Sequence, residues 1–158
     1  DEVRGVLAHE LAHIRNRDIL IGSVAAAIGM AITFGARIAM WGAMFGGGNR
    51  DRNPIGELAF ALLAPIAAMF IQAAVSRSRE FQADESAAKL IGTGEPLARA
   101  LEKLDAYALR MPVNVDPNQA SAYIINPLSA QARAGGGVSR WFSTHPPTEA
   151  RIERLRSL

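Results

Sequence analysis

Two long apolar runs dominate the pattern of hydrophobic and polar residues along the chain. The first run is ILIGSVAAAIGMAITFGA at residues 19–36, and the second is LAFALLAPIAAMFIQAAV at residues 58–75. Neither contains a charged residue, and about 20 such residues cross the hydrocarbon core of a bilayer. Both runs therefore predict membrane helices. The alternative is a pair of buried helices in a soluble all-α protein, because the many Ala and Gly residues lower the hydropathy.

The segment between the two runs, GGGNRDRNP at residues 46–54, is too short to be a domain and predicts a turn. The runs then form a helical hairpin whose outer flanks lie on the same side. Basic residues favour those flanks as the cytoplasmic side. They are Arg4, Arg15, Arg17, Arg77, Arg79 and Lys89. Arg50 and Arg52 in the turn weaken this orientation.

Shorter elements complete a mainly α fold with at most a small β element. The helix that covers residues 1–18 can be continuous with the first apolar helix, and the second long helix is stopped by the glycines at residues 92–94. The second long helix is expected at residues 55–90, and shorter helices at residues 97–111 and 148–156. The best strand candidate is residues 121–125. We expect one domain over residues 1–158, divided into 1–18, a membrane hairpin at 19–75, and 76–158.

Composition excludes several classes of protein. The chain has no cysteine, so it can form neither a disulfide nor a thiolate metal site. Its net charge is only +2, without a basic run or a pattern of stacking aromatics, and this argues against a nucleic-acid partner. Because the chain begins at Asp1, without Met or a signal segment, we expect an upstream part to be missing.

The strongest chemical signal is the run His9-Glu10-Leu11-Ala12-His13. Two histidines four residues apart lie on one helix face, where both imidazoles can bind one Zn²⁺ at about 2.0–2.1 Å. Glu10 is turned away from that face and is placed to act as the general base for hydrolysis. A pair of surface histidines on a helix is the alternative.

The third ligand of a hydrolytic zinc site must come from far along the chain. Glu80 and Asp84 are also four residues apart, so one carboxylate can bind the metal while the other accepts a hydrogen bond from a ligand imidazole. The hairpin would bring them back beside residues 9–13. A solvated charged helix face is an equally good interpretation of these two residues. His145, just before Pro146-Pro147, is by residue type alone more often a capping or surface residue.

The motifs together resemble the HtpX family of membrane-bound zinc metalloproteases, relatives of the CAAX prenyl endopeptidases. HELAH is followed by Asn16 and Asp18, and then come SREFQAD, NQASAYIINPLS and FSTHPP, in that order. The resemblance implies a gluzincin-type helical domain with Zn²⁺ ligands His9, His13 and Glu80 and the general base Glu10. It implies supporting roles around the ligands for Asp84 and Asn16.

The same resemblance raises His145 to a residue of the active site, as an oxyanion donor or as a fourth ligand. It implies an endopeptidase of the bacterial inner membrane, multi-pass, with its active site facing the cytoplasm and the lipid bilayer around it. Its substrates would be misfolded or damaged membrane proteins, in a stress response with other quality-control proteases as partners. Members of the family carry two more membrane helices and a substrate-aligning strand before the HExxH helix, and we expect these elements in the missing upstream part.

Two other classes of function are alternatives to a protease. A metal transporter or sensor would need ionisable ligands at mid-membrane depth, and the apolar runs contain none. A catalytically silent membrane scaffold, or a metal-binding protein that retains the fold, is the remaining alternative. The intact HExxH motif with Glu10 argues against it.

Overall fold

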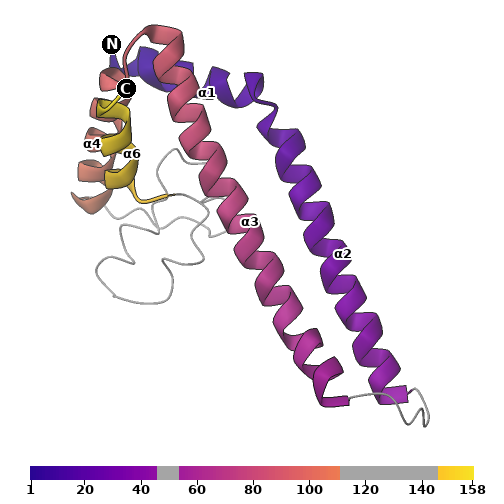
Figure 1. Cartoon of the computed structure of the whole chain (residues 1–158). Coiled ribbons are helices and arrows are strands. Elements are labelled where there is room, and N and C mark those ends of the chain that lie inside the picture. Colours follow the sequence, from indigo (N-terminus) through magenta and orange to yellow (C-terminus); the bar gives the residue numbers. More distant parts are fainter. Residues whose placement is uncertain (46–53, 111–145) are drawn as a thin grey trace. The chain divides into compact units, whose positions relative to one another are not determined.

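The computed structural model describes residues 1–45, 54–110 and 146–158, and nearly all of these residues are helical (Figure 1). The helices are α1 (Glu2–Arg15), α2 (Asp18–Phe45), α3 (Pro54–Ile91), α4 (Glu95–Arg110) and α6 (Thr148–Arg156). No strand occurs within the described ranges. The prediction of a mainly α fold is confirmed. The strand predicted at residues 121–125, the turn before Pro54 and His145 all lie outside the described residues.

A break separates α1 from α2, so of the two possibilities left open by the sequence the helices are separate. The backbone N–H of Asn16 still bonds to Ala12 O at 2.8 Å, but Arg17 adopts a left-handed conformation with φ +56°. This conformation ends a helix, because an L-residue cannot continue a right-handed turn from it. The next helix begins at Asp18.

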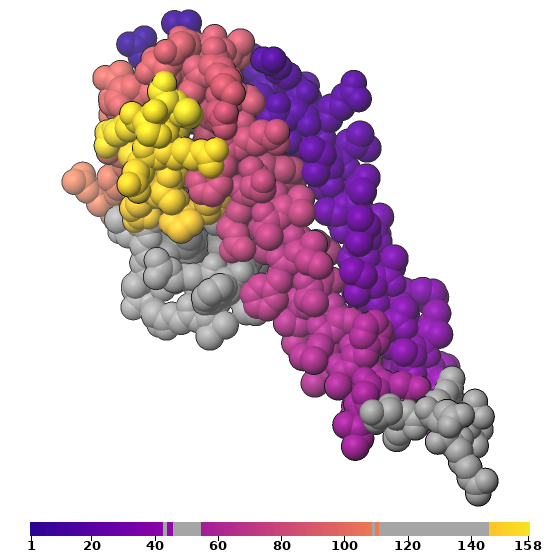
Figure 2. Space-filling model, in the orientation of Figure 1, coloured from indigo at the N-terminus to yellow at the C-terminus, as the bar shows by residue number. Residues whose placement is uncertain are grey.

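The chain divides into two compact units, Asp1–Ile19 together with Ala73–Leu158, and Leu20–Gln72. The first unit contains α1, α4, α6 and the C-terminal part of α3. Its core is built mostly from small and aliphatic residues, namely Ala8, Ala87, Ala88, Leu97, Ala98, Leu101 and Leu155. In the space-filling view the atoms of α6 lie directly against those of α3 (Figure 2).

Two glycines allow the helices of the first unit to approach closely. A Cβ on Gly5 would lie 2.6 Å from the backbone nitrogen of Leu97, so α1 crosses the start of α4 at that point. A Cβ on Gly94 would lie 2.1 Å from the carbonyl oxygen of Leu155 in α6. Protein interiors are close-packed, so these contacts leave no room for a side chain.

The second unit, Leu20–Gln72, consists of the apolar parts of α2 and α3, which run side by side in Figure 1. The ranges Asp18–Gly42 and Ile55–Ile91 are long and apolar enough to cross a membrane, and only 11% and 17% of their most apolar stretches are buried. The buried positions in this unit are small residues, Gly29, Ala36, Ala64 and Ala68. Since the large apolar side chains point outward, this pattern favours membrane helices over the buried helices of a soluble protein.

Candidate metal centre

Helix α1 presents its two histidines on the face that packs against the rest of the first unit. The buried residues of α1 are Gly5, Ala8, His9 and Ala12. His9 is 1% exposed, while the side chain of His13 is 27% exposed. From this face the imidazoles of His9 and His13 reach carboxylates of α3.

The structure brings His9, His13 and Glu80 together, so that each can offer a donor atom to one ion. The two Nε2 atoms lie 3.0 Å apart. Glu80 Oε2 lies 3.7 Å from His9 Nε2, and Glu80 Oε1 lies 3.8 Å from His13 Nε2. Tetrahedral Zn²⁺ with bonds of about 2.0–2.2 Å places its ligand atoms about 3.3–3.6 Å apart. The three donors therefore fit a zinc ion after shifts of a few tenths of an ångström.

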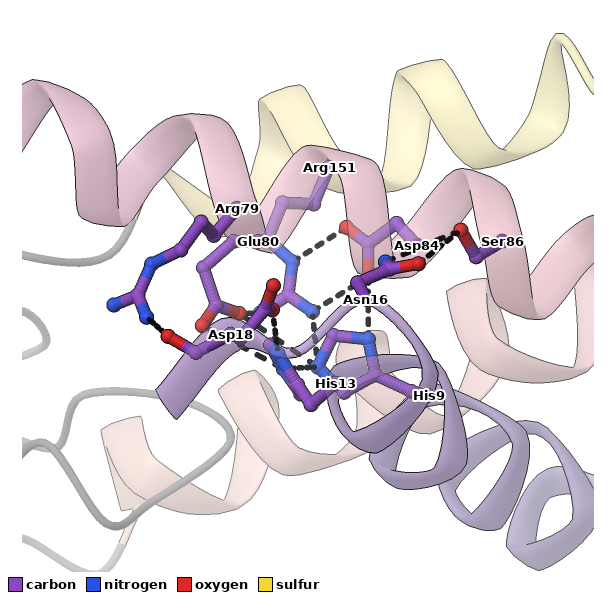
Figure 3. A network of polar contacts seen from close by, with 9 residues as sticks. All are labelled: His9, His13, Asn16, Asp18, Arg79, Glu80, Asp84, Ser86 and Arg151. Atoms are coloured by element: carbon purple, nitrogen blue, oxygen red, sulfur yellow. Dashed lines mark hydrogen bonds and ion pairs between the residues drawn. The ribbon is translucent and has the colours of Figure 1, made fainter. Parts of the chain in front are cut away.

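The donor atoms of His9, His13 and Glu80 form what we call the donor triangle. Each imidazole has a buried carboxylate on the side away from this triangle (Figure 3). Asp84 Oδ1 lies 2.9 Å from His9 Nδ1, and Asp18 Oδ2 lies 2.5 Å from His13 Nδ1. Asp84 is 2% exposed and Asp18 is 4% exposed. Ionised carboxylates only accept hydrogen bonds, so each favours a proton on Nδ1 and leaves Nε2 free to bind a metal. From the sequence this role was predicted for Asp84, and none was predicted for Asp18.

A buried arginine that the sequence analysis did not identify joins the two carboxylates of α3. Arg151 of α6 is 2% exposed and donates from Nε and Nη2 to the two oxygens of Asp84, at 2.8 and 2.7 Å. Its Nη1 lies 3.3 Å from Glu80 Oε2. One signal was available: Arg151 lies four residues before Leu155, so the two share one face of the helix expected at residues 148–156. An arginine on an inward helix face needs a buried partner.

The charge of Arg151 is retained in this buried position. Burial alone would lower the pKa of its guanidinium, but the hydrogen bonds and attraction of Asp84, and the charges of Glu80 and Glu10, outweigh burial and raise the pKa above its usual value. The cluster therefore contains two acidic groups of α3 and one permanent cation. Because this one cation only partly balances the two acidic groups, the site would attract a divalent ion to the donor triangle.

The other predicted site residues have different surroundings. Asn16 exchanges hydrogen bonds with Ser86 of α3 at 3.3 and 3.4 Å, so its side chain lies against α3 and not at an imidazole. The carboxylate that lies at the imidazole of His13 is that of Asp18, after the break in the chain. Glu10 lies next to His9 on α1 and is exposed to solvent, as a group that must meet a substrate should be. His145 precedes the described segment at residues 146–158.

These features define a class of protein. A motif helix with two imidazoles, completed by a glutamate from a second helix in a helical domain, is the arrangement of a zinc-dependent metallopeptidase. The chain belongs to peptidase family M48, whose model matches residues 1–158.

Curated relatives agree with this membership. The chain is 50% identical over 99% of its length to a "Protease HtpX homolog" of Pelotomaculum thermopropionicum, of which it covers 56%. It is 51% identical over 98% of its length to the homolog of Desulfatibacillum aliphaticivorans, covering 50% of that protein. With the homolog of Thermococcus kodakarensis the identity is 52% over the whole chain, covering 54% of that protein. The chain thus spans about half the length of these relatives, and no solved structure matches it.

Proposed function

We propose that this chain carries the catalytic centre of a zinc-dependent endopeptidase anchored in the cytoplasmic membrane. The observation that carries the proposal is the convergence of His9, His13 and Glu80 on one point, with a carboxylate behind each imidazole. This arrangement offers three protein ligands and leaves a fourth position open, as in catalytic zinc sites. Membership of a peptidase family and relatives named as proteases support it.

In this proposal His9, His13 and Glu80 hold the ion. Bound Zn²⁺ would polarise the peptide carbonyl. It would also lower the pKa of water, so that hydroxide is available to attack this carbonyl at neutral pH. The Glu10 carboxylate accepts the proton that the attacking water loses, and then delivers it to the nitrogen of the departing amine. Asp84 and Arg151 keep His9 and Glu80 oriented while charge develops. His145 would bind the oxyanion or act as a fourth ligand.

The placement of charge along the chain supports a membrane location. The first apolar run is bounded by Asp18 and Arg37, and the second by Glu57 and Arg77. Each uncharged run of 18 residues is about 27 Å long as a helix, close to the thickness of a bilayer core. The excess of arginine on the outer flanks supports a multi-pass protein of the bacterial inner membrane, with its active site facing the cytoplasm.

The proposed substrates are misfolded or damaged membrane proteins, with other quality-control proteases as partners. Support comes from the short distance along the chain between the metal centre and the first apolar run. His13 precedes that run by only a few residues. Asp18, which contacts His13, directly precedes the run. A peptidase centre so close in sequence to a membrane helix acts on chains that leave the membrane surface.

Glu10→Gln in the full-length protein, reconstituted in detergent or lipid, tests the catalytic assignment. The variant should bind one zinc ion per chain and show no cleavage of an unfolded membrane-protein substrate. Glu85→Gln is a matched control, because Glu85 is on α3, beside the site, but pairs with Lys89 at the surface. Unchanged cleavage by Glu10→Gln would contradict the role of Glu10. A wild-type protein that binds zinc but cleaves nothing would favour the silent scaffold.

A further inference from the structure

We propose that Asp18 is a positioning residue for the metal centre, which holds His13 in the ring orientation and tautomer that zinc binding needs. The inference rests on the proposed zinc site. The contact that carries it is the distance of 2.5 Å between Asp18 Oδ2 and His13 Nδ1 (Figure 3). With Nδ1–H donating to this carboxylate, the lone pair of Nε2 points toward His9 and Glu80.

The contact with His13 offsets most of the free-energy cost of burying the Asp18 carboxylate. The side chain is 6% exposed. Its Oδ1 is buried and has no hydrogen-bond partner among the described residues. A buried carboxylate is costly unless it is paired, so the imidazole of His13 is the group that offsets the burial of Asp18.

The break between α1 and α2 is what brings Asp18 to His13. In an uninterrupted helix, residue 18 would be rotated about 140° from residue 13 and would point away from the imidazole. Arg17 takes the left-handed conformation instead, which is strained for a residue with a Cβ. Backbone strain of this kind persists where the surrounding structure fixes it, and functional sites are its commonest location.

A second helix holds the chain at this point. The guanidinium of Arg79 in α3 donates a hydrogen bond to the backbone carbonyl of Asp18. Asp18 is also the first residue of α2, where the helix dipole favours a negative charge. The residue that orients His13 is thus the one from which the first apolar helix starts. The position where α2 begins and the geometry of the metal centre are therefore linked.

The test is zinc binding by the full-length protein with Asp18→Asn, measured by competition with a chromophoric chelator. The amide has the same shape, but it carries no charge and can present its NH₂ group to Nδ1, which favours the wrong tautomer. We expect the zinc dissociation constant to rise 10- to 100-fold, with an unchanged melting temperature for the zinc-free protein. Asp105→Asn, a half-buried aspartate of α4, serves as the control and should leave zinc affinity unchanged.

Equal zinc affinity of wild type and Asp18→Asn would overturn the inference and leave the proposed zinc site standing. A wild-type protein that binds no zinc would contradict the proposed function itself, and the inference with it. The ¹⁵N shifts of His13 in the zinc-loaded wild type give a second readout that does not depend on a variant. They should show a proton on Nδ1 and the metal on Nε2. The reverse assignment would overturn the role of Asp18.

Discussion

Arg151 and Asp84 form a two-pronged ion pair, with Nε and Nη2 of the guanidinium donating to the two carboxylate oxygens at 2.8 and 2.7 Å. The residues are 67 positions apart in sequence, and both side chains are 2% exposed. Asp84 in turn contacts His9 at Nδ1. The pair therefore links helix α6, near the end of the chain, to a proposed zinc ligand near its beginning.

Removal of the guanidinium should be strongly destabilising. Arg151→Met leaves the Asp84 carboxylate buried without its cation, and we expect a loss of about 3–5 kcal/mol in the free energy of unfolding. Arg151→Lys should recover only part of this loss, because an ammonium group lacks the planar pair of N–H donors that matches the two oxygens of a carboxylate. Urea unfolding of the zinc-free protein measures both effects.

The matched control is the double variant Arg151→Met with Asp84→Asn. Since it removes both charges together, its loss of stability should be clearly smaller than the sum of the two single losses. Additive losses would show that the two side chains act independently, in contradiction to the contact seen in the structure.

The two carboxylates of α3 should respond differently to neutralisation. Glu80→Gln removes a proposed ligand, so the protein should no longer hold zinc through dialysis against a weak chelator. Asp84→Asn removes only the group behind His9, so zinc should still bind in one-to-one stoichiometry with an affinity 10- to 100-fold lower. Metal analysis and competition titration separate the two cases. A larger loss of zinc in Asp84→Asn than in Glu80→Gln would reverse the assignment.

Local periodicity predicted much of the fold and part of the site. The spacing of His9 with His13, and of Glu80 with Asp84, defined one face on each of two helices, and the structure brings those faces together. The helix expected at residues 148–156 is confirmed as Thr148–Arg156. Patterns repeated along one helix are visible in a single sequence because they need no knowledge of how the helices pack.

Contacts between distant elements could not be predicted in this way. Arg151 reaches Asp84 only because α6 packs against α3, and no local pattern states which carboxylate a buried arginine will meet. Asp18 reaches His13 only because Arg17 breaks the helix, and arginine is not a residue that favours a left-handed conformation. Both residues were therefore assigned no role from the sequence, although Asp18 is part of the motif.

Helix α1 shows a further limit of periodicity. The apolar residues Val3, Leu7, Leu11 and Ile14 repeat at helical spacing, yet each is more than half exposed in the structure. The face that packs against the first unit is made of Gly5, Ala8, His9 and Ala12. Large apolar residues at helical spacing therefore do not mark the buried face of α1, because close approach of helices is achieved by small residues.

The close approach of α1 and α4 predicts a sensitive position at Gly5. In Gly5→Ala the new Cβ would lie 2.6 Å from Leu97 N and 2.9 Å from Leu97 Cα, and backbone atoms cannot move aside cheaply. We expect a loss of about 1–3 kcal/mol in stability, as for other overpacked sites. Gly35→Ala is the control, since a Cβ there meets nothing within 4 Å. Thermal unfolding should show a lower midpoint for Gly5→Ala alone, and equal midpoints would contradict the contact.

Two residues in the described part of the chain are left-handed, and they predict opposite effects of glycine. Arg17 has φ +56° and Gly92 has φ +86°. Arg17→Gly should stabilise the fold by up to about 1 kcal/mol, because glycine adopts this conformation without the strain caused by a Cβ. Gly92→Ala should destabilise it by about 1–2 kcal/mol through the backbone alone, since a Cβ there meets no atom within 4 Å.

Arg17→Ala separates backbone strain from loss of the arginine side chain. It keeps a Cβ and should therefore show none of the gain expected for Arg17→Gly, when both are compared with wild type by chemical unfolding. A gain in both variants would assign the effect to the lost charge. Because the left-handed turn is what carries Asp18 back to His13, Arg17→Gly should also leave zinc affinity unchanged, whereas Arg17→Pro, whose ring fixes φ near −65°, should weaken it together with the fold.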